Sequence, residues 1–290
     1  MSTPRFSVIE STTPNLSFAE DLVTYREAGV DAIGIVEAKL MNDRDDLALF
    51  HASGMKASSC FLSCFSILPS PYMPGPQDPF VRLETLCRSI ERLAPFEPDC
   101  CFVVPGPPGR YELHEARQIV IQGIHKLSRA AGAAGMTLGV ELMHPSLSTT
   151  FGFIHSIGDG IDVLDEVGRP NVALAIDVWH LEEPDLLAHL RANATRFASL
   201  HLNDRPEVVR SWCDRALPGD GVADIRGILG SLEEGGFDGW FELEVLSDDG
   251  SVEYDFPDSL WKRDPLELVR VGRAQFLTIW DARRTTAVHE

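Results

Sequence analysis

The sequence predicts a single closed (β/α)8 barrel, the TIM-barrel architecture, and three observations lead to this prediction. Eight short apolar segments follow one another along the chain, and an amphipathic, helix-like segment separates each from the next. Strict alternation of this kind is typical of a parallel sheet covered by helices on both faces. The length of 290 residues suits one barrel. No G-x-G-x-x-G phosphate turn follows the first apolar segment, which argues against an open doubly wound sheet.

The first half of the chain supplies four strand–helix units. Apolar runs predict strands, and amphipathic runs with a polar face predict helices. The strands are Phe6–Ser11, Ala32–Glu37, Lys56–Leu68 and Cys100–Val104, followed in turn by helices Phe18–Ala28, Asn42–Ser53, Phe80–Leu93 and 111–134. Gly29 ends the first helix, and the proline-rich segments Pro69–Pro79 and Pro105–Gly109 are loops, because proline and glycine interrupt both kinds of element.

The second half repeats the pattern without a break in composition. The strands are Leu138–Met143, Val172–Ile176, Ala198–Leu202 and Trp240–Leu246, followed in turn by helices 156–167, 185–195, 224–235 and Pro265–Ala282. We therefore expect one domain over residues 1–290, with the C-terminal helix at about 265–283 closing the barrel.

Composition and charge narrow the classes of function. The chain has 25 Lys and Arg against 44 Asp and Glu, a formal net charge of −19. Because nucleic-acid binding depends on Lys and Arg neutralising phosphates, we expect no nucleic-acid partner. No run approaches the ~18 consecutive apolar residues of a membrane span, and no signal peptide is evident, so we expect no membrane association and a cytoplasmic location. A homo-oligomer is compatible with the sequence, but nothing in it fixes one.

Each of the last four predicted strands ends in a residue that can bind a metal. Function in a barrel gathers at the carboxyl ends of the strands, and those ends carry Glu141, Asp177, His201 and the pair Glu242 and Glu244. Neighbouring strands lie ~4.8 Å apart, so these groups should converge, and burying them together without a cation would be costly. A divalent ion removes that cost. Mn²⁺ is the first choice for this oxygen-rich set, with Mg²⁺, Co²⁺ or Zn²⁺ as alternatives.

The last strand offers two glutamates on one face. The period of two puts Glu242 and Glu244 on the same side, and Glu244 lies nearer the mouth of the barrel. We therefore choose Glu244 as the metal ligand. Glu242 should lie one layer lower and could pair with a basic neighbour.

Further polar residues in the strand-end loops are candidates for substrate contact. His180 follows Asp177 by three residues, and a loop histidine facing water is the ordinary alternative. The other candidates are Glu37, His144, Arg205 and Arg215. A solvated strand edge or a helix cap is the ordinary alternative for a strand-end carboxylate such as Glu37, and loop salt bridging is the alternative for the arginine of DRALPGDG. The aromatic residues that could wall the pocket are Phe65, Trp179 and Trp212.

The order of these strand-end residues resembles a known family. The series E…DxxH…H…E, carried by VELMHP, AIDVWHL, LHLND, DRALPGDG and GGFDGWFELEV, resembles the xylose-isomerase-like barrels, and within them the sugar phosphate isomerase/epimerase group. That group includes inosose dehydratases, ketose 3-epimerases and hydroxypyruvate isomerases. The resemblance covers roughly residues 5–250 and is strongest from Leu138 onward.

The resemblance implies a site and a reaction. One divalent metal would be bound by Glu141, Asp177, His201 and Glu244, and His180 would contact a substrate oxygen. Glu141 and Glu244 would also be the acid/base pair of an isomerase or epimerase that acts on a keto-sugar or related polyol through a metal-stabilised enediolate. The alternative is a lyase, an inosose-type dehydratase that eliminates a β-hydroxyl at the same site, with His180 or His144 protonating the leaving oxygen.

Two other classes are weighed against an enzyme of this kind. A non-catalytic metal- or sugar-binding barrel would carry the same ligands but show no turnover. A DNA-processing relative of endonuclease IV should carry additional histidines on the early strands, which this acidic sequence lacks. The substrate is not fixed by the sequence, because the loops 40–45, 69–79, 105–110 and 206–222 would select it. Few basic residues lie near the mouth, which favours an unphosphorylated compound.

Overall fold

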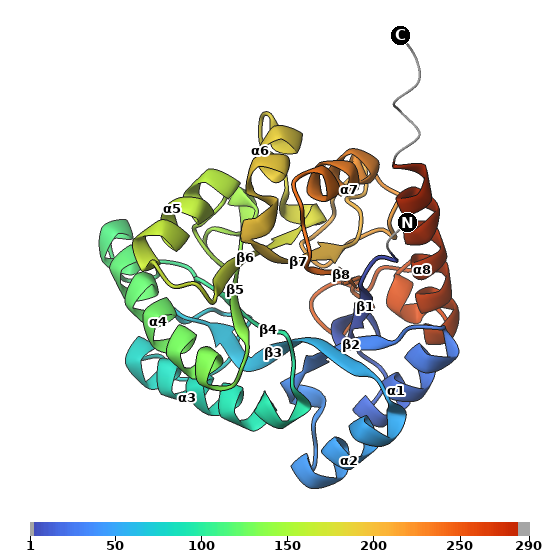
Figure 1. Cartoon of the computed structure of the whole chain (residues 1–290), viewed down its shortest axis with the longest axis horizontal. Coiled ribbons are helices and arrows are strands. Elements are labelled where there is room, and N and C mark those ends of the chain that lie inside the picture. Colours follow the sequence, from blue (N-terminus) through green and yellow to red (C-terminus); the bar gives the residue numbers. More distant parts are fainter. Residues whose placement is uncertain (1–2, 284–290) are drawn as a thin grey trace.

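The computed structural model describes residues 3–283 and contains a closed parallel barrel in the order β1 to β8. Helices surround the strands in a continuous ring (Figure 1). The strands are β1 Phe6–Ile9, β2 Ala32–Val36, β3 Lys56–Ser66, β4 Cys100–Val104, β5 Thr137–Glu141, β6 Val172–Asp177, β7 Phe197–Leu202 and β8 Trp240–Leu243. The helices are α1 Phe18–Glu27, α2 Asp43–Ser53, α3 Pro79–Leu93, α4 Leu113–Ala133, α5 Ile157–Val167, α6 Leu186–Asn193, α7 Ile225–Glu234 and α8 Pro265–Ala282.

The predicted barrel is confirmed, and the differences lie at the strand ends. β8 ends at Leu243, three residues earlier than expected, and β5 ends at Glu141, two residues earlier. At these points the backbone leaves the sheet for the rim of the barrel. A 3-10 turn begins directly after β6, at Val178–His180. The apolar residues beyond these ends therefore belong to the mouth of the barrel rather than to its wall.

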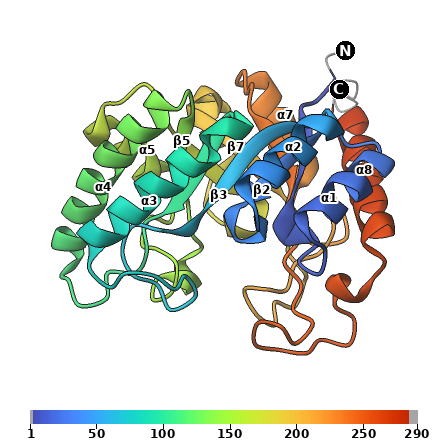
Figure 2. The same cartoon turned by 90° about the horizontal axis from the view of Figure 1, so that it is seen from below.

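Side-chain caps explain why several helices begin where they do. Ser17, Asn42, Asp78, Ser156 and Asp264 each precede a helix and accept a hydrogen bond from a backbone N–H of its first turn. Such caps satisfy donors that would otherwise have no partner at a helix start. These caps also fix the loops that lead into the helices. Figure 2 shows that the longer loops gather at one end of the barrel.

An apolar plug fills the interior of the barrel below its mouth. It consists of Ile9, Phe61, Cys100, Phe102 and Ala175, all buried. Gly139 makes room for it, because a Cβ at this position would lie 2.5 Å from the Phe102 ring. Phe61 and Phe102 of the plug pack against the ring of His201, a polar residue of β7. The main core lies outside the strands, between the sheet and the helices.

Among residues 3–283 no helix is both long and apolar enough to span a bilayer.

Candidate active site

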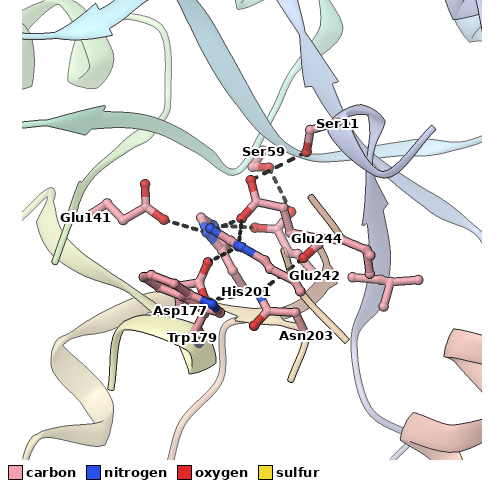
Figure 3. Close-up of polar contacts among 12 residues, drawn as sticks. Ser11, Ser59, Glu141, Asp177, Trp179, His201, Asn203, Glu242 and Glu244 are labelled. Atoms are coloured by element: carbon pink, nitrogen blue, oxygen red, sulfur yellow. Dashed lines mark hydrogen bonds and ion pairs between the residues drawn. The ribbon is translucent and has the colours of Figure 1, made fainter. Parts of the chain in front are cut away.

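Four side chains from four successive strands meet at the mouth of the barrel. They are Glu141 at the end of β5, Asp177 at the end of β6, His201 in β7 and Glu244 directly after β8. One nitrogen or oxygen atom of each lies within 4.8 Å of those of the other three (Figure 3). All four side chains are buried. We call these four residues the strand-end cluster.

Strand register and barrel closure produce this convergence. Asp177 pairs with His201 across β6 and β7, so the two residues lie at the same height in the sheet. Glu141 pairs with Ala175, two residues before Asp177 and on the same side of β6. Glu244 follows the last paired residue of β8, where its backbone N–H still donates to the Leu202 carbonyl. Neighbouring strands therefore deliver one group each to the same place.

The imidazole of His201 lies at the centre of the cluster. Its Nδ1 is 2.9 Å from Glu141 Oε1 and 3.6 Å from Glu244 Oε2. The ring packs edge-on against Phe102 of the apolar plug, with centroids 4.8 Å apart. Its Nε2 lies 3.9 Å from Glu242 Oε2, and within residues 3–283 neither of these two buried atoms has a hydrogen-bond partner.

Glu242 lies one layer lower and is held mainly by hydroxyl groups. Its Oε1 accepts hydrogen bonds from Ser7, Ser58 and Ser59 at 3.1, 2.7 and 2.7 Å. These serines come from β1 and β3 and are buried. Among residues 3–283, the basic neighbour of Glu242 is the more distant His201 ring, at 3.9 Å.

Asn203 holds two members of the cluster in place. Its Nδ2 donates to Asp177 Oδ1 at 2.9 Å and to the backbone carbonyl of Glu244 at 3.1 Å. Asp177 Oδ1 also accepts from the Trp179 backbone N–H at 2.7 Å. One carboxylate oxygen of Asp177 is thus fixed by two donors, and the other remains for ionic contact.

Arg215 supplies a buried positive charge next to the cluster. Its Nη1 lies 2.5 Å from Asp177 Oδ2 and 2.8 Å from Glu244 Oε2. The residue comes from the long loop between β7 and α7, which folds back over the mouth. Asp204 organises that loop by accepting the backbone N–H groups of Gly219, Gly221 and Ala223.

The two carboxylates that Arg215 touches differ in pKa. Burial acts to raise the pKa of Asp177, but Arg215 and the nearby histidines outweigh it and hold the pKa well below its usual range. Burial raises the pKa of Glu244 to about 7, against the opposing effect of Arg215. Asp177 is therefore the permanently ionised member of this pair.

The two histidines of the site shift in opposite directions. Burial acts to lower the pKa of His201, but the carboxylates of Glu141, Glu244 and Glu242 outweigh it and raise the pKa to about 10. For His180 burial dominates and lowers the pKa to about 4. His180 Nδ1 accepts the His144 backbone N–H at 3.3 Å, which assigns the ring proton of the neutral imidazole to Nε2.

The donor set fits a divalent cation. Three carboxylate residues and one imidazole provide hard ligands of the kind that Mn²⁺, Mg²⁺, Co²⁺ or Zn²⁺ accept. Arg215 compensates one of three negative charges, which leaves a surplus that a dication would neutralise. A metal-ligating histidine commonly donates its second ring N–H to a carboxylate, and the unpartnered Nε2 of His201 faces Glu242.

A cavity of about 250 Å³ opens beside the cluster. Glu141, Glu244, His180 and Arg215 line it, together with Phe65 and Trp212 among the aromatic residues named from the sequence. Asp177, His201 and Trp179 do not line it.

Three residues expected to contact substrate lie outside the cavity lining. Glu37 is bound by Arg92 at 3.0 Å and by the Ser63 backbone N–H at 2.8 Å. The side chains of His144 and Arg205 both bind Glu182. Each of these three side chains is thus held by a partner outside the cavity lining.

Sequence reasoning missed several residues of the site. Asn203 follows His201 by two residues and so shares its face of β7, which is a signal that could have identified it. Tyr72 and Phe151 line the cavity from the loops after β3 and β5. No periodic pattern marks such loop residues, so the sequence offers no comparable signal for them.

Most of this chain belongs to one known protein family. The model of the family described as "Xylose isomerase-like TIM barrel" matches residues 24–270. Among curated proteins, an inosose dehydratase of Geobacillus thermodenitrificans is 27% identical over 157 residues, 46% of this chain and 48% of that protein. An inosose isomerase of Halalkalibacterium halodurans is 23% identical over 138 residues, 46% of this chain and 47% of that protein. The aligned part thus spans about half the length of these curated relatives.

Solved structures match nearly the whole fold. A Sinorhizobium meliloti protein superposes with a TM-score of 0.82 at 25% identity, covering 94% of this chain and 98% of that one. An L-ribulose 3-epimerase gives 0.78 at 17% identity, over 99% and 100% of the two chains. An IolI protein described with a bound zinc atom gives 0.76 at 18% identity, over 97% and 100%.

Proposed function

We propose that this chain, which belongs to the xylose isomerase-like TIM barrel family, is a divalent-metal-dependent isomerase or epimerase that moves a proton next to a carbonyl group of a keto-sugar or related polyol. The observation that carries the proposal is the convergence of Glu141, Asp177, His201 and Glu244 at the mouth of the barrel beside the cavity, with one nitrogen or oxygen atom of each within 4.8 Å of those of the others. The names of the curated relatives and of the epimerase structure support the substrate class.

The four residues of the strand-end cluster would hold the cation. Bound there, it would act as a Lewis acid that stabilises the negative charge developing when a proton leaves the carbon next to a carbonyl. Mn²⁺ is our first choice, and the zinc in one structural relative keeps Zn²⁺ as an alternative.

Glu141 and Glu244 are the proposed acid/base pair. Both face the cavity, and they come from β5 and from the end of β8. One carboxylate would remove the substrate proton, and the other would return it to the opposite face or to the neighbouring carbon. The neutral His180 would donate its Nε2 proton to a substrate oxygen, since its Nδ1 is already an acceptor.

A lyase at the same site is the second candidate. The observation that favours it is the name of several curated relatives, which are inosose dehydratases. The same proton removal would then be followed by loss of a β-hydroxyl group, and His180, which lines the cavity, would protonate the leaving oxygen.

Deuterium exchange tests the proposal and separates the two outcomes. Metal-free protein would be loaded in turn with Mn²⁺, Mg²⁺, Co²⁺ and Zn²⁺ and incubated with ketoses and inososes in deuterated water. Deuterium uptake with the hydroxyls intact supports an isomerase or epimerase, and an enone or diketone absorbance supports a lyase. Glu141→Gln should abolish either signal, while Glu91→Gln on the exposed face of α3 should not. Bound metal with no exchange on any compound would contradict the proposal.

A further inference from the structure

The floor and the walls of the cavity differ in chemistry. Apart from the Tyr72 hydroxyl and the Trp212 indole N–H, the polar side-chain groups in the lining belong to the strand-end cluster or lie beside it. They are Ser11, Glu141, His180, Arg215 and Glu244. Every other lining side chain is aliphatic, aromatic or a methionine. The cavity is therefore polar at one end and apolar over the rest of its surface.

Three aromatic rings from three different loops cover the apolar end. Tyr72 stacks on Phe151 with centroids 5.4 Å apart and ring planes within 2° of parallel. Trp212 lies 4.9 Å from the Phe151 centroid and 5.1 Å from that of Tyr72. We call these three residues the aromatic roof. Their loops follow β3, β5 and β7, so the roof is assembled by contacts between loops.

The roof continues into an apolar wall. Met73, Val104, Met143 and Leu147 are all buried and pack with Phe151 in one cluster. This cluster is separate from the main core outside the strands and from the plug inside the barrel. Met73, Val104, Met143, Leu147 and Phe151 carry no side-chain N–H or O–H group, and the polar groups of the cluster are the indole N–H of Trp179, which does not line the cavity, and that of Trp212.

A bare polyol is a poor match for such a surface. Its outer hydroxyls would be buried against the wall without partners, and each unpaired hydroxyl would weaken binding by about tenfold. An aromatic substituent would instead lie against aromatic rings and adjustable methionine side chains. The wall thus selects for an apolar group at a fixed place relative to the reacting atoms.

We infer that the substrate is an amphiphilic keto-sugar or hydroxy-ketone whose oxygen-bearing end lies against Glu141, Glu244 and His180 and whose aromatic or branched apolar substituent lies under the aromatic roof. This inference rests on the proposed function, which supplies the oxygen-bearing end. The roof residues are then determinants of specificity, and they take no part in proton transfer.

Phenyl and methyl 3-keto-β-D-glucopyranosides test the inference, because they differ only in the substituent. Binding of each to the manganese-loaded protein would be measured by titration calorimetry, and deuterium exchange would be followed on the same samples. We expect the phenyl compound to bind at least about tenfold more tightly. In Trp212→Ala this ratio should fall below about threefold, with affinity for the methyl compound little changed. Tyr254→Ala, which removes an exposed ring outside the cavity, is the matched control and should keep the ratio.

The outcomes separate this inference from the proposed function. Equal binding of the two compounds with exchange on both would overturn the inference and leave the proposed function standing. A tenfold preference that survives in Trp212→Ala and in Phe151→Ala would also overturn it. A preference that depends on the roof, without exchange under any metal, would support the ligand class and overturn the proton-transfer chemistry. Circular dichroism and melting curves would confirm that each variant is folded.

Discussion

The Arg215 guanidinium lies 2.8 Å from the Glu244 carboxylate, so a permanent positive charge is built into the proposed metal site. The same Nη1 atom also contacts Asp177. Arg215 thus contacts two of the proposed metal ligands, and it would compete with a cation for their charge. Its contributions to metal affinity and to turnover should therefore have opposite signs.

Replacing Arg215 by glutamine separates these two contributions. Arg215→Gln should bind Mn²⁺ more tightly, by up to about tenfold, because a charge that repels the cation and occupies its ligands is lost. Deuterium exchange should fall by at least about tenfold, because Glu244 loses its fixed orientation at the cavity. Calorimetric titration with Mn²⁺ and exchange rates would be compared with Arg196→Gln, an exposed arginine paired with Asp165. Weaker Mn²⁺ binding in Arg215→Gln would contradict this account.

Asn203 should contribute to metal affinity without touching the metal. Asn203→Ala removes the donors to Asp177 Oδ1 and to the Glu244 carbonyl, so both ligands gain freedom. Loss of such an orienting partner typically costs about 10–100-fold in affinity. Mn²⁺ titrations would measure this, with Asn193→Ala as the control, since Asn193 donates to the His189 carbonyl within α6 and lies away from the cluster. An unchanged Mn²⁺ affinity would show that Asp177 holds its position without this contact.

The sequence predicts the fold and the strand-end cluster for the same reason. Alternation of strands and helices determines the barrel, and barrel closure brings the ends of consecutive strands together. Asp177 and His201 could therefore be placed from their positions in β6 and β7 alone. Glu242 and Glu244 share a face because side chains alternate along a strand, and Glu244 comes later in the chain and so lies nearer the mouth. These two facts place Glu244 in the cluster and Glu242 one layer below it.

What the sequence could not supply depends on contacts between distant segments. Glu37 is a strand-end glutamate like Glu141, yet it is bound by Arg92, which lies 55 residues further along the chain. His144 and Arg205 likewise contact Glu182, a residue of another loop. The sequence around a strand end does not show whether its polar side chain is free to contact a substrate or is bound by a residue from another loop or helix.

Glu10 lies outside the strand-end cluster, and its carboxyl group should make the stability of the protein depend on pH. It is fully buried, and burial together with Asp21 raises its pKa well above the ordinary value. A carboxyl group whose pKa is raised on folding stabilises the protein below its unfolded pKa, and that stability is lost as pH rises through the folded pKa. Glu10→Gln mimics the protonated form and keeps the acceptor for the Val36 backbone N–H.

Glu10→Gln should therefore be more stable than the wild type at pH 8 and similar to it at pH 4. The gain at pH 8 should be at least about 1 kcal/mol, which corresponds to about 2–4 °C in melting temperature. Urea titrations at both pH values would measure it, and Glu91→Gln is the exposed control. A variant that is less stable than the wild type at pH 8 would mean that Glu10 is ionised in the folded protein.

Arg82 ties the loop that carries Tyr72 to the barrel. It is fully buried, and its guanidinium donates to the backbone carbonyls of Ser66 at 2.7 Å and Met73 at 2.6 Å, next to Tyr72. Lysine keeps the charge but lacks the planar fork that reaches several acceptors at once. The loop between β3 and α3 should therefore depend on arginine at this position.

Arg82→Lys should lose about 3 kcal/mol of stability, because buried carbonyl groups are left without donors. The backbone amides of Tyr72 and Met73 should exchange faster with solvent, and the preference for the phenyl ligand should weaken as the roof loses one of its three rings. Hydrogen exchange followed by mass spectrometry would localise the change. Arg88→Lys, on the exposed face of the same helix, should leave exchange in this loop unaltered. If Arg82→Lys changes global stability but not exchange at Tyr72, the arginine supports the core of the barrel rather than the roof.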